Sequence, residues 1–150
     1  MRGHWTYLYR AVDKCGQTIN FRLSRTRDVS AAKAFFKKAI RHEGQPPHAI
    51  TLDGYAASHR AVREMRIEGL LPKGTKLRSS KYLNNLIEQD HRGVKFRTGT
   101  MLGFKNFEFA VITIAGVELL RRIHKNQFAL SRLRIKGQAA PANWNAVLAA

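Results

Sequence analysis

Hydrophobic side chains recur at two different spacings along this chain, and each spacing predicts one kind of secondary structure. Residues 5–12 are rich in Trp, Tyr, Leu and Val, and residues 18–23 alternate apolar and polar side chains. Aromatic and β-branched side chains at a period of two are typical of strands. Residues 13–17, with the sequence Asp-Lys-Cys-Gly-Gln, separate the two runs and are rich in turn formers. The pattern therefore predicts a β-hairpin.

A helical spacing follows in residues 30–41. Apolar side chains recur there at steps of three and four, and the opposite side of the helix carries the basic residues Lys33, Lys37, Lys38 and Arg41. This arrangement predicts an amphipathic helix. Ser30 is the expected N-terminal cap, and Gly44 with the two prolines after it is expected to end the helix.

A strand and a helix are predicted next, with an acid at the point where the strand ends. Residues 49–52 form a short apolar run that stops at Asp53, and residues 58–68 again place apolar side chains on one helical face. In α/β sheets, functional groups gather at the carboxyl ends of strands. Asp53 is therefore a candidate functional residue.

The second half of the chain is predicted to be mainly helical. Residues 71–80 indicate a loop or a short edge strand, and residues 81–97 indicate a helix. Residues 104–123 are too long an apolar segment for a strand, so they predict a largely buried helix. The order of elements predicts an α/β fold. We expect one domain over residues 1–130 and a basic, then Ala-rich, tail over residues 131–150.

Charge narrows the class of partner. The chain has 27 Lys and Arg against 10 Asp and Glu, a net charge of +17, and the excess is +8 in residues 1–75 (14 against 6) and +9 in residues 76–150 (13 against 4). Such an excess in the folded body indicates a polyanionic partner, with nucleic acid first. No apolar run reaches the ~18 residues of a membrane span, and no signal peptide is apparent. We expect no membrane partner and a cytoplasmic location.

Cysteine and histidine offer little chemistry. Cys15 is the only cysteine, so no internal disulfide can form, and the six histidines lack the spacing of metal ligands. Carboxylates are the better candidates for metal binding. Glu88 falls on the face of its predicted helix that lies away from the apolar stripe, and with Asp53 it could hold a divalent metal beside a phosphodiester. The alternatives are a solvated turn residue for Asp53 and an exposed acid paired with Arg92 for Glu88.

A resemblance to a known family carries more information than these two acids. Residues 81–92, KYLNNLIEQDHR, and residues 101–105, MLGFK, resemble the third-acid region of bacterial DDE-type insertion-sequence transposases of the replicative, cointegrate-forming group. Residues 5–13 are similar to the second strand of that family and residues 50–53 to its second-acid strand. Residues 114–118 and the tail around Trp144 fit its C-terminal end.

The resemblance implies an RNase H-like fold, the integrase-like catalytic core, with a mixed five-stranded sheet and helices on both faces. It implies Mg²⁺- or Mn²⁺-dependent DNA strand cleavage and transfer during DNA transposition, with Asp53 and Glu88 as the second and third catalytic, metal-binding acids. DNA, as transposon ends and target, is the implied partner, and a homodimer is expected because two ends must be joined. The residues implied to contact DNA are Lys81, His91, Arg92, Lys95 and Arg97.

One departure from the family matters for activity. The first aspartate of the family lies on a strand upstream of the segment that matches residues 5–13, where only residues 1–4 are present. We therefore expect an N-terminal truncation that removes the first strand, and a chain that is inactive alone. Asp13 is not expected to replace this acid, because it lies in the hairpin turn. We also expect this chain to lack the helix-turn-helix with which such transposases recognise the transposon ends.

Two alternatives remain open at the level of sequence. The chain could be a non-catalytic DNA-binding remnant of a transposase, as its charge and the missing acid suggest. It could also be a basic RNA-associated protein, which composition allows but the spacing of the two acids does not predict.

Overall fold

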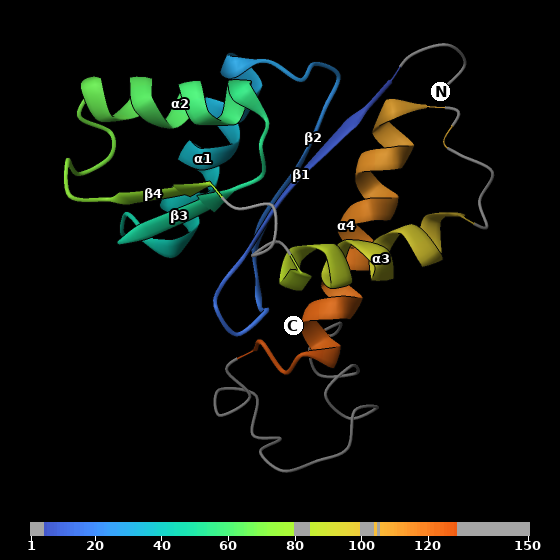
Figure 1. Ribbon diagram of the computed structural model, residues 1–150. Coiled ribbons are helices and arrows are strands. Elements are labelled where there is room, and N and C mark those ends of the chain that lie inside the picture. Colours follow the sequence, from blue (N-terminus) through green and yellow to red (C-terminus); the bar gives the residue numbers. More distant parts are fainter. Residues whose placement is uncertain (1–4, 80–84, 100–103, 105, 129–150) are drawn as a thin grey trace. The chain divides into compact units, whose positions relative to one another are not determined.

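The structure is a computed structural model that describes residues 5–79, 85–99, 104 and 106–128 (Figure 1). The chain divides into two compact units, Met1–Gly93 and Val94–Ala150, and each unit is described separately below. The predicted domain over residues 1–130, followed by a tail, stays a prediction, because residues 129–150 lie outside the described part.

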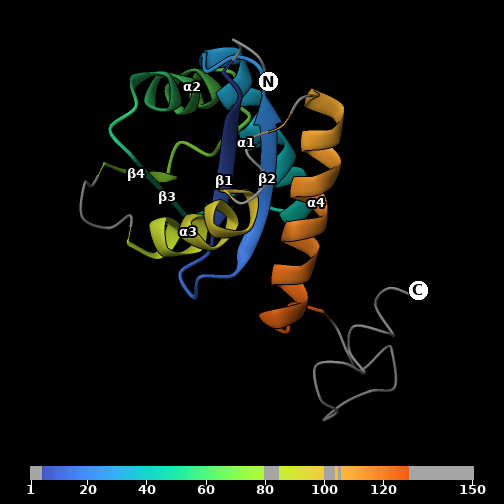
Figure 2. The same ribbon diagram turned by 90° about the vertical axis from the view of Figure 1, so that its right-hand side faces the viewer.

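The first unit begins with the predicted β-hairpin (Figure 2). Strand β1, Tyr7–Val12, pairs antiparallel with strand β2, Thr18–Ser24. In the turn between them, the Asp13 carboxylate accepts hydrogen bonds from the backbone N–H groups of Cys15 and Gln17, each at 2.8 Å. The predicted turn position of Asp13 is confirmed, and its Oδ1 atom stabilises the turn by accepting both hydrogen bonds.

Helix α1, Val29–Glu43, confirms the predicted amphipathic helix, but one expectation about its start was wrong. The cap is Asp28 rather than Ser30, and the Asp28 carboxylate accepts a 2.7 Å hydrogen bond from the Ala31 N–H. A capping residue needs an extended backbone, which Asp28 has at φ −124°, whereas Ser30 is already helical. The helix ends at Gly44, whose φ of +74° is readily adopted by glycine.

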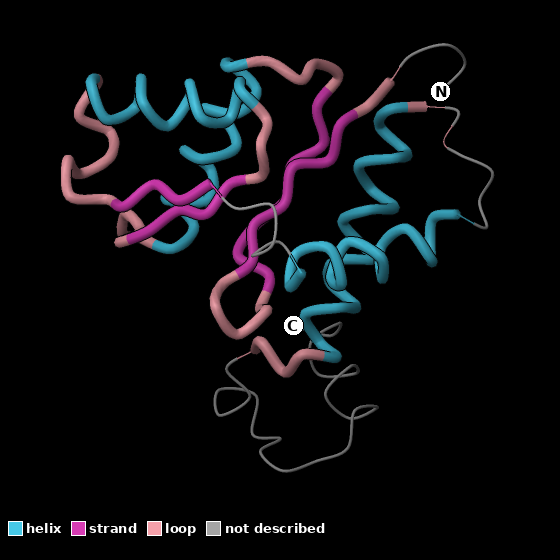
Figure 3. Tube along the Cα trace, in the orientation of Figure 1, coloured by secondary structure: helices cyan, strands magenta, loops and turns pink. Residues whose placement is uncertain are grey.

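Strand β3, Ala49–Leu52, helix α2, Ala56–Ile67, and strand β4, Lys76–Ser79, form a βαβ unit in which the two strands are parallel (Figure 3). The expected loop or short edge strand thus proves to contain a strand. A core cluster lies between this pair of strands and helices α1 and α2. It consists of Leu52, Val62, Met65 and Leu71, with Phe36, Ile40, Ile50 and Leu77 packed against them.

Two further helices complete the described chain. Helix α3, Asn85–Gly99, overlaps the predicted helical segment, residues 81–97, and ends two residues beyond it. The division between the two units passes through this helix. Helix α4, Phe107–His124, confirms the prediction that the long apolar segment forms a helix and not a strand. It is less buried than expected, since Phe109 and Ile112 are each 66% exposed.

The architecture is mixed α/β, as predicted. Within the described residues the strands form two separate pairs, β1–β2 and β3–β4. The finer prediction, a five-stranded RNase H-like sheet, is taken up as a proposal below. Among the described helices, none combines the length and the apolar character needed to cross a membrane.

Candidate functional site

Asp53 is the first residue after β3, at the carboxyl end of the strand, where the sequence predicted a functional group. Leu52, the residue before it, is buried in the core and anchors the strand end. The Asp53 side chain is 54% exposed, and its Oδ1 atom accepts a 3.3 Å hydrogen bond from the Tyr55 N–H. Its other oxygen, Oδ2, lies 3.8 Å from the Nη2 atom of Arg27. The carboxylate is therefore accessible and already faces a positive charge.

Arg27 comes from the loop between β2 and α1, and it is held by Tyr55. Its guanidinium carbon lies 3.9 Å from the centroid of the Tyr55 ring, and the Tyr7 ring is 6.0 Å away on the hairpin. The Tyr55 hydroxyl donates a hydrogen bond to the Arg27 carbonyl oxygen. His59, on α2, contacts the loop that carries Asp53, because its Nε2 atom lies 2.9 Å from the Asp53 carbonyl oxygen. These contacts fasten the loop that carries Asp53 to the loop before α1.

Sequence analysis did not single out Arg27 or Tyr55. The two residues are 28 positions apart and lie on different loops, so no periodicity connects them. An aromatic residue just after the candidate acid was the only local signal. The partner of that ring became visible only in three dimensions.

The chemistry of Asp53 suits a hard divalent cation. A carboxylate that is accessible to solvent offers the oxygen ligands that Mg²⁺ and Mn²⁺ prefer. One positively charged group, the Arg27 guanidinium, already lies 3.8 Å from this carboxylate. Within the described residues, however, no three His, Cys, Asp or Glu side chains gather where they could hold a metal ion. Asp53 can thus offer one carboxylate ligand, and a complete set of three such ligands is not assembled within the described residues.

Glu88, the other candidate acid, lies in the first turn of α3 and is exposed, as its place on the predicted helix required. It belongs to the same unit as Asp53, but residues 80–84 between β4 and α3 are outside the described part. That the two carboxylates share one metal ion stays a prediction.

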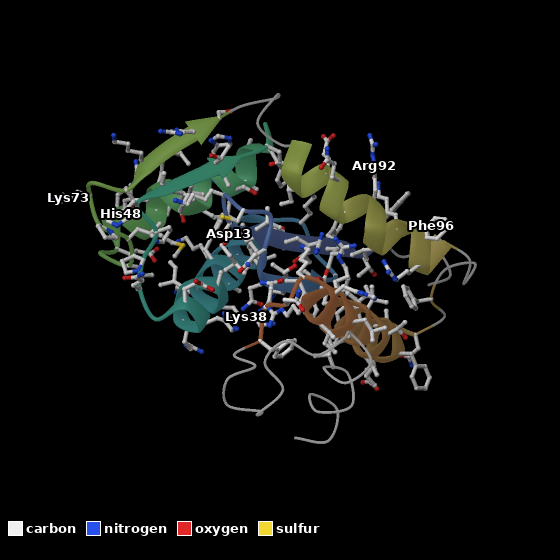
Figure 4. All side chains as sticks on the ribbon, turned by 90° about the horizontal axis from the view of Figure 1, so that it is seen from below. Asp13, Lys38, His48, Lys73, Arg92 and Phe96 are labelled. Atoms are coloured by element: carbon white, nitrogen blue, oxygen red, sulfur yellow. The ribbon has the colours of Figure 1, made fainter. Side chains whose placement is uncertain are left out.

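The five residues predicted to bind DNA fall in different surroundings. In the first unit Arg92 is exposed and projects from α3, whereas His91 is half-buried and has an interaction partner (Figure 4). In the second unit Lys95 and Arg97 are exposed. Lys81 lies outside the described residues.

The β3–β4 pair presents a basic face that the prediction did not include. Ile50 and Leu77 pack against the core, so the alternate residues of each strand turn to the other side. There Lys76 and Arg78 on β4 are exposed, and Arg78 is the partner of Thr51 on β3. Asp53 follows Thr51 by two residues, so strand alternation places it at the end of this basic face.

Comparison with known proteins gives this geometry a context. A family model described as a DDE domain, of the transposase type, matches residues 1–127. The transposase for insertion sequence-like element IS431mec of Staphylococcus aureus strain Mu50 is 37% identical over 125 residues, which cover 83% of this chain and 54% of that protein. The transposase for insertion sequence element IS257 in transposon Tn4003, also from Staphylococcus aureus, has the same identity and coverage.

A third relative, an uncharacterized protein of Yersinia pseudotuberculosis, is 30% identical over 71 residues, which cover 46% of this chain and 66% of that protein. No solved structure matches the chain. The family match covers most of the chain, which therefore belongs to the DDE transposase domain family of insertion sequences. The chain spans about half the length of the Staphylococcus aureus transposases that it matches.

Proposed function

We propose that this chain is part of the catalytic domain of a DNA transposase, in which Asp53 and Glu88 bind a divalent metal ion, Mg²⁺ or Mn²⁺. The observation that carries the proposal is the Asp53 carboxylate, which is exposed at the carboxyl end of β3 in a chain that belongs to the DDE family. Its companion Glu88 is exposed on a helix of the same unit.

The two acids would act by binding the metal ion and fixing its position beside the phosphodiester. A bound divalent ion would offset charge on the phosphodiester and activate the attacking hydroxyl. Asp53 contributes a carboxylate whose rotation is limited by the hydrogen bond from the Tyr55 N–H. Glu88 contributes a second carboxylate from the first turn of α3. Membership in the DDE family supports the use of a divalent metal ion. That this ion is Mg²⁺ or Mn²⁺ is part of our proposal.

We propose that the complete sheet is RNase H-like. Among the described strands, β1 pairs only with β2 and β3 pairs only with β4, so each has one edge whose backbone groups are unpaired in the ladder. A further strand that pairs with β1 on one side and with β3 on the other would join the two pairs into one five-stranded sheet. In the proposed fold, this strand belongs to the upstream sequence and carries the first acid.

DNA is the proposed partner, both as transposon ends and as target, and the protein would act in the cytoplasm. The net charge of +17 favours a polyanion, and exposed cations of the first unit such as Arg92 and Arg78 suit phosphate contacts. A homodimer is proposed because transposition joins two DNA ends to one target.

The decisive experiment is a DNA nicking and strand-transfer assay with Mg²⁺ or Mn²⁺. It should compare this chain with a chain extended upstream. The extended chain should cut DNA, and both Asp53→Ala and Glu88→Ala should abolish cutting, while Glu43→Ala, which removes an exposed acid at the end of α1, should not. The chain alone should bind DNA without cutting it.

The competing function, that of a non-catalytic DNA-binding remnant, predicts a different result in this assay. If the protein is a non-catalytic DNA-binding remnant, both chains bind DNA in a salt-sensitive and metal-independent way, and neither acid matters for any reaction. The high positive charge favours this candidate as much as the first, so the assay with the two acid variants separates them.

A further inference from the structure

We propose that Arg27 is the internal counter-ion of Asp53, and that a divalent metal ion has to displace its guanidinium in order to bind the carboxylate. This inference rests on the proposed metal-binding role of Asp53. It adds a residue from a loop 26 positions away to the site, and it assigns that residue an effect on metal affinity.

The guanidinium is held near the carboxylate by more than charge. An exposed ion pair at 3.8 Å would be weak alone, because two mobile side chains lose freedom when they meet. Here the Tyr55 ring lies 3.9 Å from the guanidinium carbon, and the Tyr55 hydroxyl fixes the Arg27 carbonyl oxygen. The side chain thus has a platform and a tethered backbone, which reduce the entropy still lost when the ion pair forms.

The geometry makes the two cations competitors. The Oδ1 atom of Asp53 already accepts the Tyr55 N–H, and Arg27 faces the other oxygen, Oδ2. A metal ion at Oδ2 and a guanidinium beside it would repel each other at short range. His59 does not act as a counter-ion of the Asp53 carboxylate, because its ring contacts the Asp53 carbonyl oxygen instead. Occupation of Asp53 by the metal and the contact with Arg27 are therefore negatively coupled.

The test is a Mn²⁺ titration of the whole chain, followed by paramagnetic broadening of the backbone amide signals of residues 53–55. Arg27→Gln should lower the apparent Kd for Mn²⁺ at Asp53 by about two- to five-fold, the range expected for loss of one exposed ion pair. Arg60→Gln is the matched control: it removes the same charge from the same unit, but its guanidinium pairs with Glu64, 2.7 Å away. It should leave the Kd unchanged.

Tyr55 provides a second, independent variant. Tyr55→Phe keeps the ring against the guanidinium but removes the hydrogen bond to the Arg27 carbonyl oxygen, so it should strengthen Mn²⁺ binding less than Arg27→Gln does. Tyr55→Leu removes both supports and should strengthen Mn²⁺ binding as Arg27→Gln does. Amide spectra of each variant report whether it is folded, so a misfolded Arg27 variant would leave the Tyr55 pair to decide.

Three results would overturn the inference. Mn²⁺ binding that is unchanged or weaker in folded Arg27→Gln would show that the guanidinium does not compete. An equal gain in Arg60→Gln would show a general effect of charge. If Asp53→Asn leaves the broadening intact, Asp53 binds no metal and the proposed function fails as well, whereas the first two results leave that function standing.

Discussion

At the scale of single residues, burial differs sharply between neighbours on α2. Met65 is fully buried in the core cluster, whereas Ile67, two residues later, is 86% exposed. Met65→Ala should lower the free energy of unfolding by about 2–5 kcal/mol, because it leaves a cavity. Ile67→Ala should change it by less than ~0.5 kcal/mol. Urea denaturation of both variants checks this pair, and similar losses in the two would show that α2 does not pack on this face.

The ion-pair network between α1 and α2 predicts how stability depends on pH. The Lys33 Nζ atom lies 2.6 Å from Glu64 and 2.5 Å from Glu68, and Arg60 contacts Glu64 as well. Hydrogen bonds to Glu64 and then Glu68 raise the pKa of Lys33. Hydrogen bonds from Lys33 and then Arg60 lower the pKa of Glu64. Both shifts favour the charged forms, so the network stabilises the fold around neutral pH.

The sign of each shift fixes the pH window. The contribution of Glu64 is present above its unfolded pKa of roughly 4.3 and is lost as pH falls through its lower folded value. That of Lys33 is present below roughly pH 10.4 and is lost as pH rises through its higher folded value. Glu64→Gln should therefore flatten the acid side of a plot of Tm against pH. Glu43→Gln, which alters an exposed acid elsewhere, should keep the shape of the original curve, and an unchanged acid side in Glu64→Gln would contradict the assignment.

Sequence alone predicted that Asp53 and Glu88 are exposed but did not predict the contact of Arg27 with Tyr55, for a physical reason. The exposed positions of Asp53 and Glu88 follow from local rules, namely the end of a strand and the polar side of a helix. The contact of Arg27 with Tyr55 depends on how two distant loops meet, which no local rule supplies. The cap of α1 was misassigned because Ser30 and Asp28 are both good capping residues, and only the backbone conformation decides between them.

At the scale of elements, the basic face of the β3–β4 pair predicts a path for DNA. Lys76 and Arg78 are exposed at alternate positions of β4, about 6.6 Å apart along the strand, and Lys73 and His48 lie at the opposite end of the pair from Asp53 (Figure 4). The double substitution Lys76→Gln with Arg78→Gln should weaken DNA binding and reduce the slope of log K against log salt by about 1.4–1.8.

The control for this path is an equal loss of charge on another surface. Lys37 and Arg41 are exposed on α1, so the double substitution Lys37→Gln with Arg41→Gln removes two charges as well. Fluorescence anisotropy at several salt concentrations would measure both variants. Equal changes in slope would mean that DNA binds to the charge of the whole molecule and not along β4.

Sequence patterns predicted most elements and the pairing of the two hairpin strands, but not the pairing of β3 with β4. The hairpin, α1 and β3 appear close to their expected bounds, because each has a strong local pattern or a clear turn beside it. Strand β4 was ambiguous since only four residues, Lys76–Ser79, pair with β3, and three of them are exposed. Its strand conformation comes from the parallel partner 27 positions earlier. Helix α4 was expected to be largely buried, yet Phe109 is exposed. An apolar sequence alone therefore does not show that other parts of the protein pack against every face of a helix.

At the scale of the whole molecule, the proposal that the two pairs of strands belong to one sheet can be tested by hydrogen exchange. If one further strand joins β1 to β3, the backbone amides of these strands that now face away from β2 and β4 gain hydrogen-bond partners in a chain extended upstream. Their hydrogen exchange should slow by about tenfold or more, which corresponds to ~1.4 kcal/mol of added opening free energy. Amides inside α1, which are already bonded within the helix, provide the reference. Slower exchange in β1 and β3 relative to α1 would support one joined sheet, whereas unchanged exchange in β3 would mean that the parallel pair keeps an open edge and that the proposed RNase H-like order is wrong.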